Sequence, residues 1–166
     1  MKTIYFIRHA KSSWSFPQLN DLERPLNKRG YQSASLIGHW MKEKGVILDA
    51  MITSPSVRTL STTQIIATHI KFPIHKIEIK DSFYEFSGYG DPFFRYLKTL
   101  PSNITKVAVF GHNSTFENMT HKISNGFVDR VPTCGVCVSN YNQDSWENIA
   151  IDHIEFVDFV APKMLE

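Results

Sequence analysis

The sequence predicts an α/β domain, a three-layer sandwich whose mostly parallel central sheet carries helices on both faces. Short, nearly continuous hydrophobic runs alternate along the chain with longer amphipathic segments, which is typical of strands that alternate with helices. Of the 166 residues, 42% are hydrophobic and 20% are charged, as in ordinary globular proteins. We find no repeat, linker or low-complexity segment, and we expect one domain over residues 1–166.

The first third of the chain predicts a strand, a loop and a helix. Residues 2–7 are rich in β-branched and aromatic side chains, which favours a buried strand. Residues 10–26 are polar and contain two prolines, so we expect a loop. We expect a helix over residues 27–44, because apolar side chains recur there as a stripe at helical spacing, and Gly45 can end it. The stripe consists of Ala34, Ile37 and Met41, with Trp40 beside them.

The next segment predicts a second strand and helix. Residues 49–53 are a short apolar run, and we expect a strand there. A helix should follow and reach about Ile70, because Ser54 can cap it and Pro55 suits its first turn. Residues 74–79 alternate between apolar and polar side chains, which predicts a half-exposed strand.

The remaining elements repeat this alternation. Residues 81–90 contain two glycines and read as a loop, and Asp91-Pro92 then begins a helix through Leu100. A buried strand over 106–110 precedes a helix that Asn113 or Ser114 caps and that extends to about Ser124. Two further strands complete the sheet, over 136–141 and 153–160.

Charge and hydropathy exclude several classes of protein. Eighteen Lys and Arg against sixteen Asp and Glu give a net charge of +2, which argues against a general nucleic-acid partner. No apolar run is long enough for a transmembrane helix, so we expect no membrane association. The apolar stretch before Arg8 is too short for a signal peptide, and with only two cysteines we expect a cytoplasmic protein. The sequence does not define an oligomeric state.

Cys134 and Cys137 form a C-x-x-C motif, which occurs in redox sites and as half of many zinc sites. No second cysteine pair or histidine pair completes a zinc set. The flanking residues are typical of a strand, in which positions three apart point to opposite faces. We therefore expect two reduced, packed cysteines.

Polar side chains follow three of the predicted buried strands. Arg8 and His9 end the first, Arg58 lies one turn into the helix after the second, and His112 follows the strand over 106–110. The carboxyl ends of parallel strands meet at one edge of a sheet, where ligands bind. Two arginines, two histidines and helix N-termini at that edge predict an anion site that suits a phosphoryl group. A lone histidine is more often structural, and the other five are interpreted in that way.

These residues also occur in a recognisable order. Arg8-His9-Ala10 after an N-terminal strand resembles the R-H-G signature of the histidine phosphatase superfamily, also called phosphoglycerate mutase-like. The segments 21–30, Ser54-Pro55-Ser56-Val57-Arg58 and Gly111-His112-Asn113 resemble its further blocks, and together they cover most of the chain. The short length makes the chain most similar to the small SixA-type phosphohistidine phosphatases. Ala10 stands where many members carry glycine.

The resemblance and the chemistry together imply roles for these residues. His9 is the nucleophile and forms a phosphohistidine intermediate. Arg8, Arg58 and His112 stabilise the charge on the phosphoryl oxygens, and the backbone amide of Asn113 adds a donor. Positive charge is already present without a metal, so we expect neither a metal nor a cofactor.

A leaving alkoxide needs a proton, and the family often has an acid after the strand that follows the second helix. Glu85 lies at about that point among aromatic residues, which raise a carboxyl pKa by desolvation. The alternative is an exposed loop carboxylate, and Asp21 and Asp91 rank below Glu85 as acids. A protonated imidazole leaves without much help, so a phosphohistidine phosphatase can lack a clear acid.

The expected function is hydrolysis of protein phosphohistidine or of small phosphomonoesters. The partner is accordingly a phosphorylated protein or a small phosphorylated molecule. The alternatives are a small-metabolite phosphatase or mutase and a non-catalytic phosphate-binding module on the same fold. The mutase is disfavoured by the short chain, and the module by the presence of Arg8, His9, Arg58 and His112.

Overall fold

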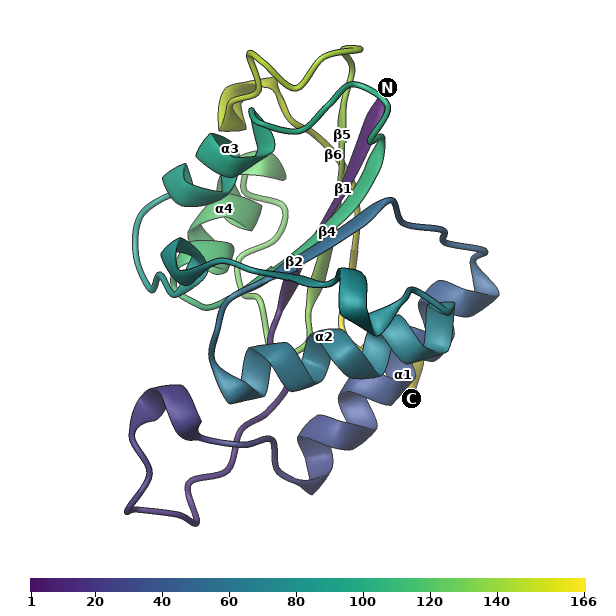
Figure 1. The fold of residues 1–166 in the computed structure, drawn as a ribbon. Coiled ribbons are helices and arrows are strands. Elements are labelled where there is room, and N and C mark those ends of the chain that lie inside the picture. The colour runs from purple at the N-terminus through teal and green to yellow at the C-terminus, as the bar shows by residue number, and fades with distance from the viewer.

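The computed structural model describes all 166 residues, and its six strands form one mixed sheet in the order β3-β2-β4-β1-β5-β6 (Figure 1). The strands are β1 (Lys2–Arg8), β2 (Ala50–Thr53), β3 (Glu78–Ile79), β4 (Lys106–Gly111), β5 (Val136–Tyr141) and β6 (Glu155–Val160). The first four pair with one another in parallel, whereas β5 pairs antiparallel with both β1 and β6. The predicted α/β class with a mostly parallel sheet is confirmed.

Four helices cover the two faces of the sheet. They are α1 (Lys28–Glu43), α2 (Val57–Ile70), α3 (Asp91–Leu97) and α4 (Thr115–Ile123). In Figure 1, α3 and α4 lie to the left of the sheet, and α1 and α2 lie together below it and to the right. Four short 3₁₀ turns lie in the connections, and a fifth follows β6. The first of them, η1 (Asp21–Glu23), interrupts the loop predicted over 10–26. None of the helices combines the length and the apolar composition that crossing a bilayer requires.

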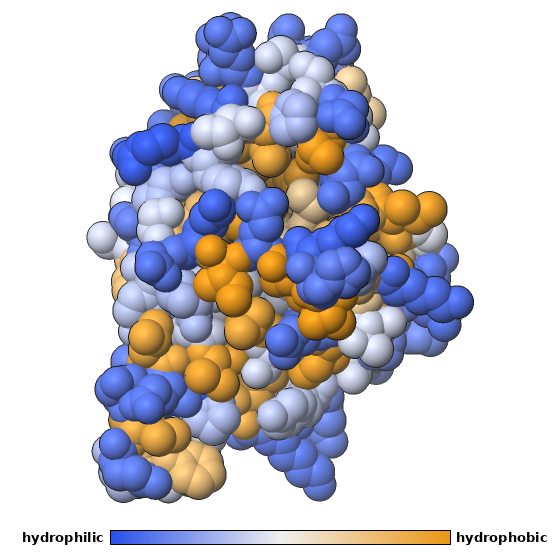
Figure 2. Space-filling model, viewed as in Figure 1, coloured by the Kyte–Doolittle hydropathy of each residue, from blue (hydrophilic) through white to orange (hydrophobic).

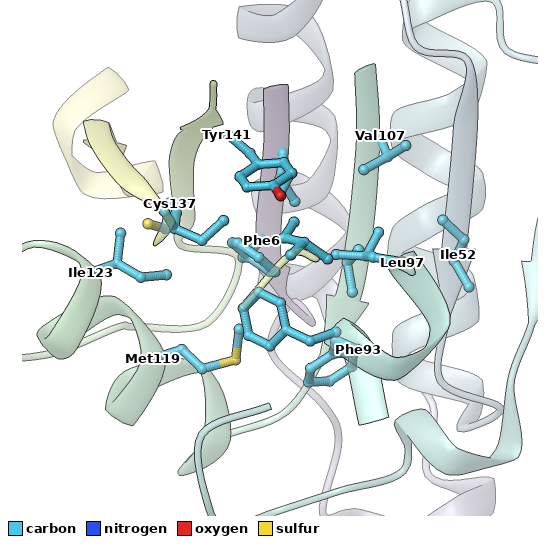
Figure 3. Close-up of a cluster of buried hydrophobic side chains, with 14 of the residues drawn as sticks. Phe6, Ile52, Phe93, Leu97, Val107, Met119, Ile123, Cys137 and Tyr141 are labelled. Carbon is cyan, nitrogen blue, oxygen red and sulfur yellow. The ribbon is translucent and has the colours of Figure 1, made fainter. Parts of the chain in front are cut away.

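The core consists of two hydrophobic clusters, one on each face of the sheet. Successive strand side chains point to opposite faces, so Phe6 of β1 packs with α3 and α4, whereas Ile7 packs with α1 and α2. Figure 3 shows the first cluster, in which Phe93 and Met119 from the helices meet Phe6. Both clusters draw residues from β1, β2, β4 and β5, and they fix these strands between two helical layers.

The start of α2 differs from the prediction. Ser56, not Ser54, is the N-cap, and its hydroxyl accepts a hydrogen bond from the backbone N–H of Thr59. The helix begins at Val57, so Ser56 directly precedes it, and Pro55 lies outside the helix. The Ser54 hydroxyl therefore does not cap this helix. The cap of α1 is Asn27, whose side chain accepts from Gly30 N at 2.8 Å.

The strand predicted over 74–79 was wrong for most of its length. Residues Ile74–Lys76 form a 3₁₀ turn, and only Glu78–Ile79 pair with β2. Pro73 fixes the backbone just before this turn, and Ile74 and Ile77 are three positions apart, which is the spacing of a 3₁₀ turn. Only Ile77 to Ile79 alternates between apolar and polar side chains as a strand does. Figure 2 shows hydrophobic side chains in the middle of the visible face, over β2, α2 and the segment after α2, a segment in which Ile74 and Ile79 are exposed.

Candidate active site

The carboxyl ends of β1, β2 and β4 converge at one edge of the sheet, and three of the predicted site residues meet there. His9 directly follows β1, His112 directly follows β4, and Arg58 is the second residue of α2, which follows β2. The two imidazole ring centroids are 5.2 Å apart. Arg58 lies against both rings, with Nε 3.4 Å from His9 Nε2 and Nη2 3.5 Å from His112 Nδ1. In Figure 1 the segment after β1 runs past the start of α2 at this edge.

The hydrogen bond of His9 defines which ring nitrogen carries the proton. His9 Nδ1 lies 2.7 Å from the carbonyl oxygen of Ala10, which can only accept, so Nδ1 must donate. The lone pair of the neutral ring is therefore on Nε2, the nitrogen that faces Arg58. Burial lowers the pKa of His9 to about 3, and the charges of Arg58 and Arg8 act in the same direction.

His112 is fully buried, and its environment was not predicted from the sequence. Its Nε2 lies 2.8 Å from the hydroxyl of Ser54, which is not the N-cap of α2. The rings of Tyr84 and Phe86 pack against the imidazole at centroid distances of 5.4 and 4.6 Å. Burial lowers the pKa of His112 to about 2, with further contributions from His9 and Arg58, so the ring is neutral without a bound anion.

Arg8 lies at the end of β1 with part of its guanidinium unpaired. Nη1 donates to the carbonyl oxygen of Val131 at 3.0 Å, whereas the buried Nε has no hydrogen-bond partner. Burial lowers the pKa of Arg8, and the nearby charge of Glu117 opposes that effect. A buried donor without a partner is costly, and an anion at this edge of the sheet would satisfy it.

Asn113, just before α4, binds the main-chain carbonyl group of Val131, which also accepts from Arg8. Its Nδ2 donates to Val131 O at 2.9 Å and to Glu117 Oε2 at 3.0 Å. Glu117 Oε2 also accepts from the backbone N–H of Val131 at 3.2 Å, so the Val131 peptide is held on both sides. The side chain of Asn113 thus supports the residue that holds Arg8. Its backbone N–H makes no hydrogen bond, and the sequence predicted this N–H as a phosphate donor.

Glu85, the predicted acid, forms no hydrogen bond or ion pair with His9, Arg58 or His112. Its neighbours Tyr84 and Phe86 face His112, while the half-buried Glu85 carboxylate makes no hydrogen bond or ion pair. The backbone carbonyl of Glu85 accepts from the hydroxyl of Thr115, which fixes this segment to α4. Asp91 is exposed at the start of α3.

Two residues of the loop after β1 join the site. Asp21 was predicted only as a weaker candidate for the acid, and Arg24 lies in the 21–30 segment of the family resemblance without a predicted role. The Asp21 carboxylate accepts from Arg58 Nη2 at 2.9 Å, from Arg24 Nη2 at 3.1 Å and from the hydroxyl of Tyr84. Burial raises the pKa of Asp21, but the hydrogen bonds from Tyr84 and Arg58 outweigh burial and hold the pKa below its usual range. Asp21 is therefore ionised and unsuited to the acid role. No local pattern in the sequence marks Asp21 as a partner of Arg58, because the two residues are 37 positions apart.

The structure has no group of three or more His, Cys, Asp and Glu side chains arranged to hold a metal ion. Cys134 and Cys137 are free and buried, and they belong to the clusters on opposite faces of the sheet. Burial raises the pKa of the Cys134 thiol to about 12. Both thiols are thus packed in the protonated form, as predicted, although Cys134 lies in the turn before β5 and not in a strand.

Curated relatives share about a quarter of their residues with this chain. An uncharacterized chloroplastic protein of Arabidopsis thaliana is 24% identical over 152 residues, which cover 88% of this chain and 69% of that protein. The uncharacterized phosphatase PhoE of Bacillus subtilis is 27% identical over 132 residues, which cover 76% of this chain and 63% of that protein.

Solved structures share the fold over nearly the whole chain. The protein histidine phosphatase SixA complexed with tungstate has a TM-score of 0.82 at 18% identity, with 99% of each chain covered. A phosphoserine phosphatase from Entamoeba histolytica, in complex with 3-phosphoglyceric acid, has a TM-score of 0.67 at 15% identity, with 100% of each chain covered. Residues 4–91, more than half of the chain, match the family described as the histidine phosphatase superfamily (branch 1). The protein therefore belongs to the histidine phosphatase superfamily.

Proposed function

We propose that the protein is a metal-independent phosphatase that hydrolyses phosphohistidine on a protein partner, with small phosphomonoesters as poorer substrates. The observation that carries this proposal is the state of His9. Its Nδ1–H donates to the Ala10 carbonyl, so the Nε2 lone pair faces the Arg58 guanidinium and the His112 ring. A neutral imidazole held in this way is a nucleophile beside donors for the group that it attacks.

In the first step, His9 Nε2 donates its lone pair to phosphorus, and the bond from phosphorus to the leaving group breaks. The leaving group takes the bonding electrons, and the phosphoryl group is now on His9 Nε2. In the second step, water attacks phosphorus, and the P–Nε2 bond breaks with its electron pair returning to Nε2. Both protons of the water leave with inorganic phosphate, which releases one of them to solvent at neutral pH. His9 returns to its neutral form, still donating from Nδ1 to Ala10.

The surrounding donors stabilise the charge that develops on the phosphoryl oxygens. Arg58 offers its Nε and Nη2, Arg8 offers its unpaired Nε, and Asn113 offers its backbone N–H. A bound dianion favours protonation of His112, opposite to the effect of burial, and a protonated ring donates from Nδ1 while Nε2 stays bonded to Ser54. Preorganised donors of this kind supply most of the catalysis in phosphoryl transfer.

Leaving-group chemistry supports phosphohistidine as the substrate. Hydrolysis of an alkyl ester needs an acid for the leaving alkoxide. The Glu85 carboxylate makes no hydrogen bond or ion pair with the three central residues, and Asp21 is ionised. A phosphorylated imidazole leaves as a protonated or neutral ring without such help, so it suits a site with this composition.

The test compares substrates on the same enzyme. We expect kcat/KM for a phosphohistidine-bearing protein to exceed that for aryl phosphate and for common metabolite phosphates by at least about 10-fold, which corresponds to roughly 1.4 kcal/mol of barrier. His9→Ala, which removes the proposed nucleophile, is the matched blank for each substrate. A higher kcat/KM for a metabolite phosphate would replace this proposal with a small-molecule phosphatase. Activity on none of the substrates would favour a phosphate-binding module.

A further inference from the structure

The Arg58 guanidinium is held along one edge by a single residue of the loop after β1. Arg58 Nη1 donates to the main-chain carbonyl oxygen of Asp21 at 2.6 Å, and Nη2 donates to the Asp21 carboxylate at 2.9 Å. These two bonds occupy the end of the guanidinium fork that joins Nη1 and Nη2. The side chain of Arg58 is only 2% exposed, so water contributes little to holding it.

The other edge of the same guanidinium faces the reacting groups. Nε lies 3.4 Å from His9 Nε2, and Nη2 lies 3.5 Å from His112 Nδ1. Both distances are long for hydrogen bonds, so the donors on this edge are only weakly satisfied. A phosphoryl group that reaches His9 Nε2 therefore meets two parallel donors, in the bidentate geometry that suits its oxygens.

We infer that Asp21 is a positioning residue, which holds Arg58 by its outer edge and so presents the Nε–Nη2 edge to the phosphoryl group. This inference rests on the proposed function for the identity of the group transferred. Asp21 touches neither His9 nor the proposed position of phosphorus, and it acts only through Arg58.

Asp21 can hold Arg58 because Asp21 is itself held. The Asp21 side chain is 44% exposed, but Arg24 donates to its Oδ1 from Nε and Nη2, and the Tyr84 hydroxyl donates to Oδ2. Arg24 is buried and also donates to the hydroxyl of Ser12 at 2.7 Å, three residues after His9. Its guanidinium lies 3.6 Å from the centre of the Trp14 ring. The orientation of Arg58 thus depends on how the loop after β1 is folded.

The competing interpretation is that Asp21 obstructs the site, because it accepts hydrogen bonds from Arg58 that phosphate would otherwise accept. The geometry favours positioning, because one of the two acceptors is a main-chain carbonyl within the η1 turn. A bound anion would have to unfold that turn to displace it, whereas the inner edge accepts an anion with no displacement. The two interpretations predict opposite effects when the Asp21 charge is removed.

The experiment is a double-mutant cycle between Asp21→Asn and Arg58→Lys on the full chain. We expect Asp21→Asn to lower kcat roughly 100-fold, as small misplacements of catalytic groups do, with KM changed by less than about threefold. A lysine ammonium has no planar edge that Asp21 could orient. In the Arg58→Lys background, adding Asp21→Asn should therefore lower kcat by a further factor of less than about three. Glu23→Gln is the control, since Glu23 lies in the same turn but bonds only to Asn20, and it should retain wild-type kcat.

Several outcomes would overturn the inference. They are a kcat for Asp21→Asn at or above wild type, tighter binding of inorganic phosphate by that variant, or additive losses in the cycle. Should Asp21→Asn fail to fold, Tyr84→Phe serves instead, because it keeps the ring against His112 and removes only the donor to Asp21; an unchanged kcat would then count against positioning.

The test separates this inference from the proposed function. If the wild-type chain hydrolyses no substrate, the proposed function fails, and the same cycle is measured by calorimetric binding of inorganic phosphate. Asp21→Asn should then weaken binding at least fivefold in the wild-type background and much less in the Arg58→Lys background. Equal losses in both backgrounds would reject the positioning role independently of catalysis.

Discussion

The Ser54 hydroxyl lies 2.8 Å from Nε2 of His112 and so connects the end of β2 to the end of β4. Both residues are fully buried, which makes the bond a fixed part of the structure. Because the Ser54 hydroxyl holds Nε2, the other ring nitrogen of His112 is the one that faces Arg58. The same contact orients the proposed phosphate donor.

Ser54→Ala should therefore lower activity without unfolding the protein. We expect kcat to fall roughly 10-fold or more, as for other substitutions of a side chain that orients a functional histidine. The readouts are kcat for a phosphohistidine-bearing protein and the midpoint of urea unfolding. Ser35→Ala, on the exposed side of α1, is the matched control and should leave both unchanged. A Ser54→Ala enzyme within twofold of wild-type kcat would show that this bond does not orient His112.

His9→Ala should lose nearly all activity, because this variant lacks the proposed nucleophile. In the wild-type chain, a rapid quench during turnover should trap phosphate on His9 in a form that acid cleaves and base does not. Peptide mapping of the quenched enzyme identifies the residue. Retention of more than about a tenth of the wild-type kcat in His9→Ala, a loss under about 1.4 kcal/mol of barrier, would show that another residue is the nucleophile.

Activity should survive exhaustive treatment with EDTA. Arg8 and Arg58 supply the positive charge that a metal would otherwise bring to the phosphoryl oxygens. Orthovanadate, which mimics five-coordinate phosphorus, should inhibit the chelated enzyme as well as the untreated one. A chelated enzyme that is inactive and regains activity with Mg²⁺ or Zn²⁺ would contradict metal independence.

Glu85→Gln should leave the hydrolysis of phosphohistidine within about threefold of wild type, because a leaving imidazole needs little help from an acid. If substrate binding brings Glu85 to the leaving group of an ester, the same variant should hydrolyse alkyl and aryl phosphates about 100-fold more slowly. Initial rates on both substrate classes measure the difference. A large loss on phosphohistidine itself would mean that Glu85 has a role other than proton donation.

The neutral histidines should make the protein less stable in acid. The folded pKa values of His9 and His112 are lowered to about 3 and about 2, below the ordinary value near 6.5 of an unfolded histidine. Between about pH 3 and pH 6.5 the unfolded chain binds more protons than the folded chain. The free energy of unfolding therefore falls as the pH decreases below about 6.5. The loss should be roughly 1 kcal/mol per pH unit for each histidine.

Urea unfolding at pH 7 and at pH 5 measures this slope. His112→Asn, which cannot be protonated in either state, should reduce the slope by the share of one histidine. His9→Asn should reduce the slope by the same amount, and the double variant should lose the contributions of both histidines to the pH dependence of the free energy of unfolding. A slope that is identical in the wild type and in the double variant would mean that neither histidine is held neutral in the folded chain.

Much of the fold could be predicted because strongly patterned segments determine their own structure. β1 and β5 occupy runs predicted as strands, and α1 (Lys28–Glu43) lies within the helix predicted over 27–44. The position of His9, Arg58 and His112 also followed from the sequence, since each comes just after a strand of a parallel sheet, where strand ends must meet. The prediction failed where a short run was interpreted with the wrong period, as at Ile74–Lys76, where apolar residues three apart mark a 3₁₀ turn and not a strand.

Local sequence patterns were enough to predict the α/β class, the strand ends that carry His9, Arg58 and His112, and the burial of the two cysteines. The hydrogen bonds from Ser54 to His112 and from Arg58 to Asp21 became visible only in the folded chain. These pairs lie 37 or more residues apart, or depend on how a loop is folded. A periodic pattern reports which face of an element is buried, because burial repeats along the element. A hydrogen bond between two loops has no such repeat, and its partners are chosen by distances that exist only once the sheet has brought the strand ends together.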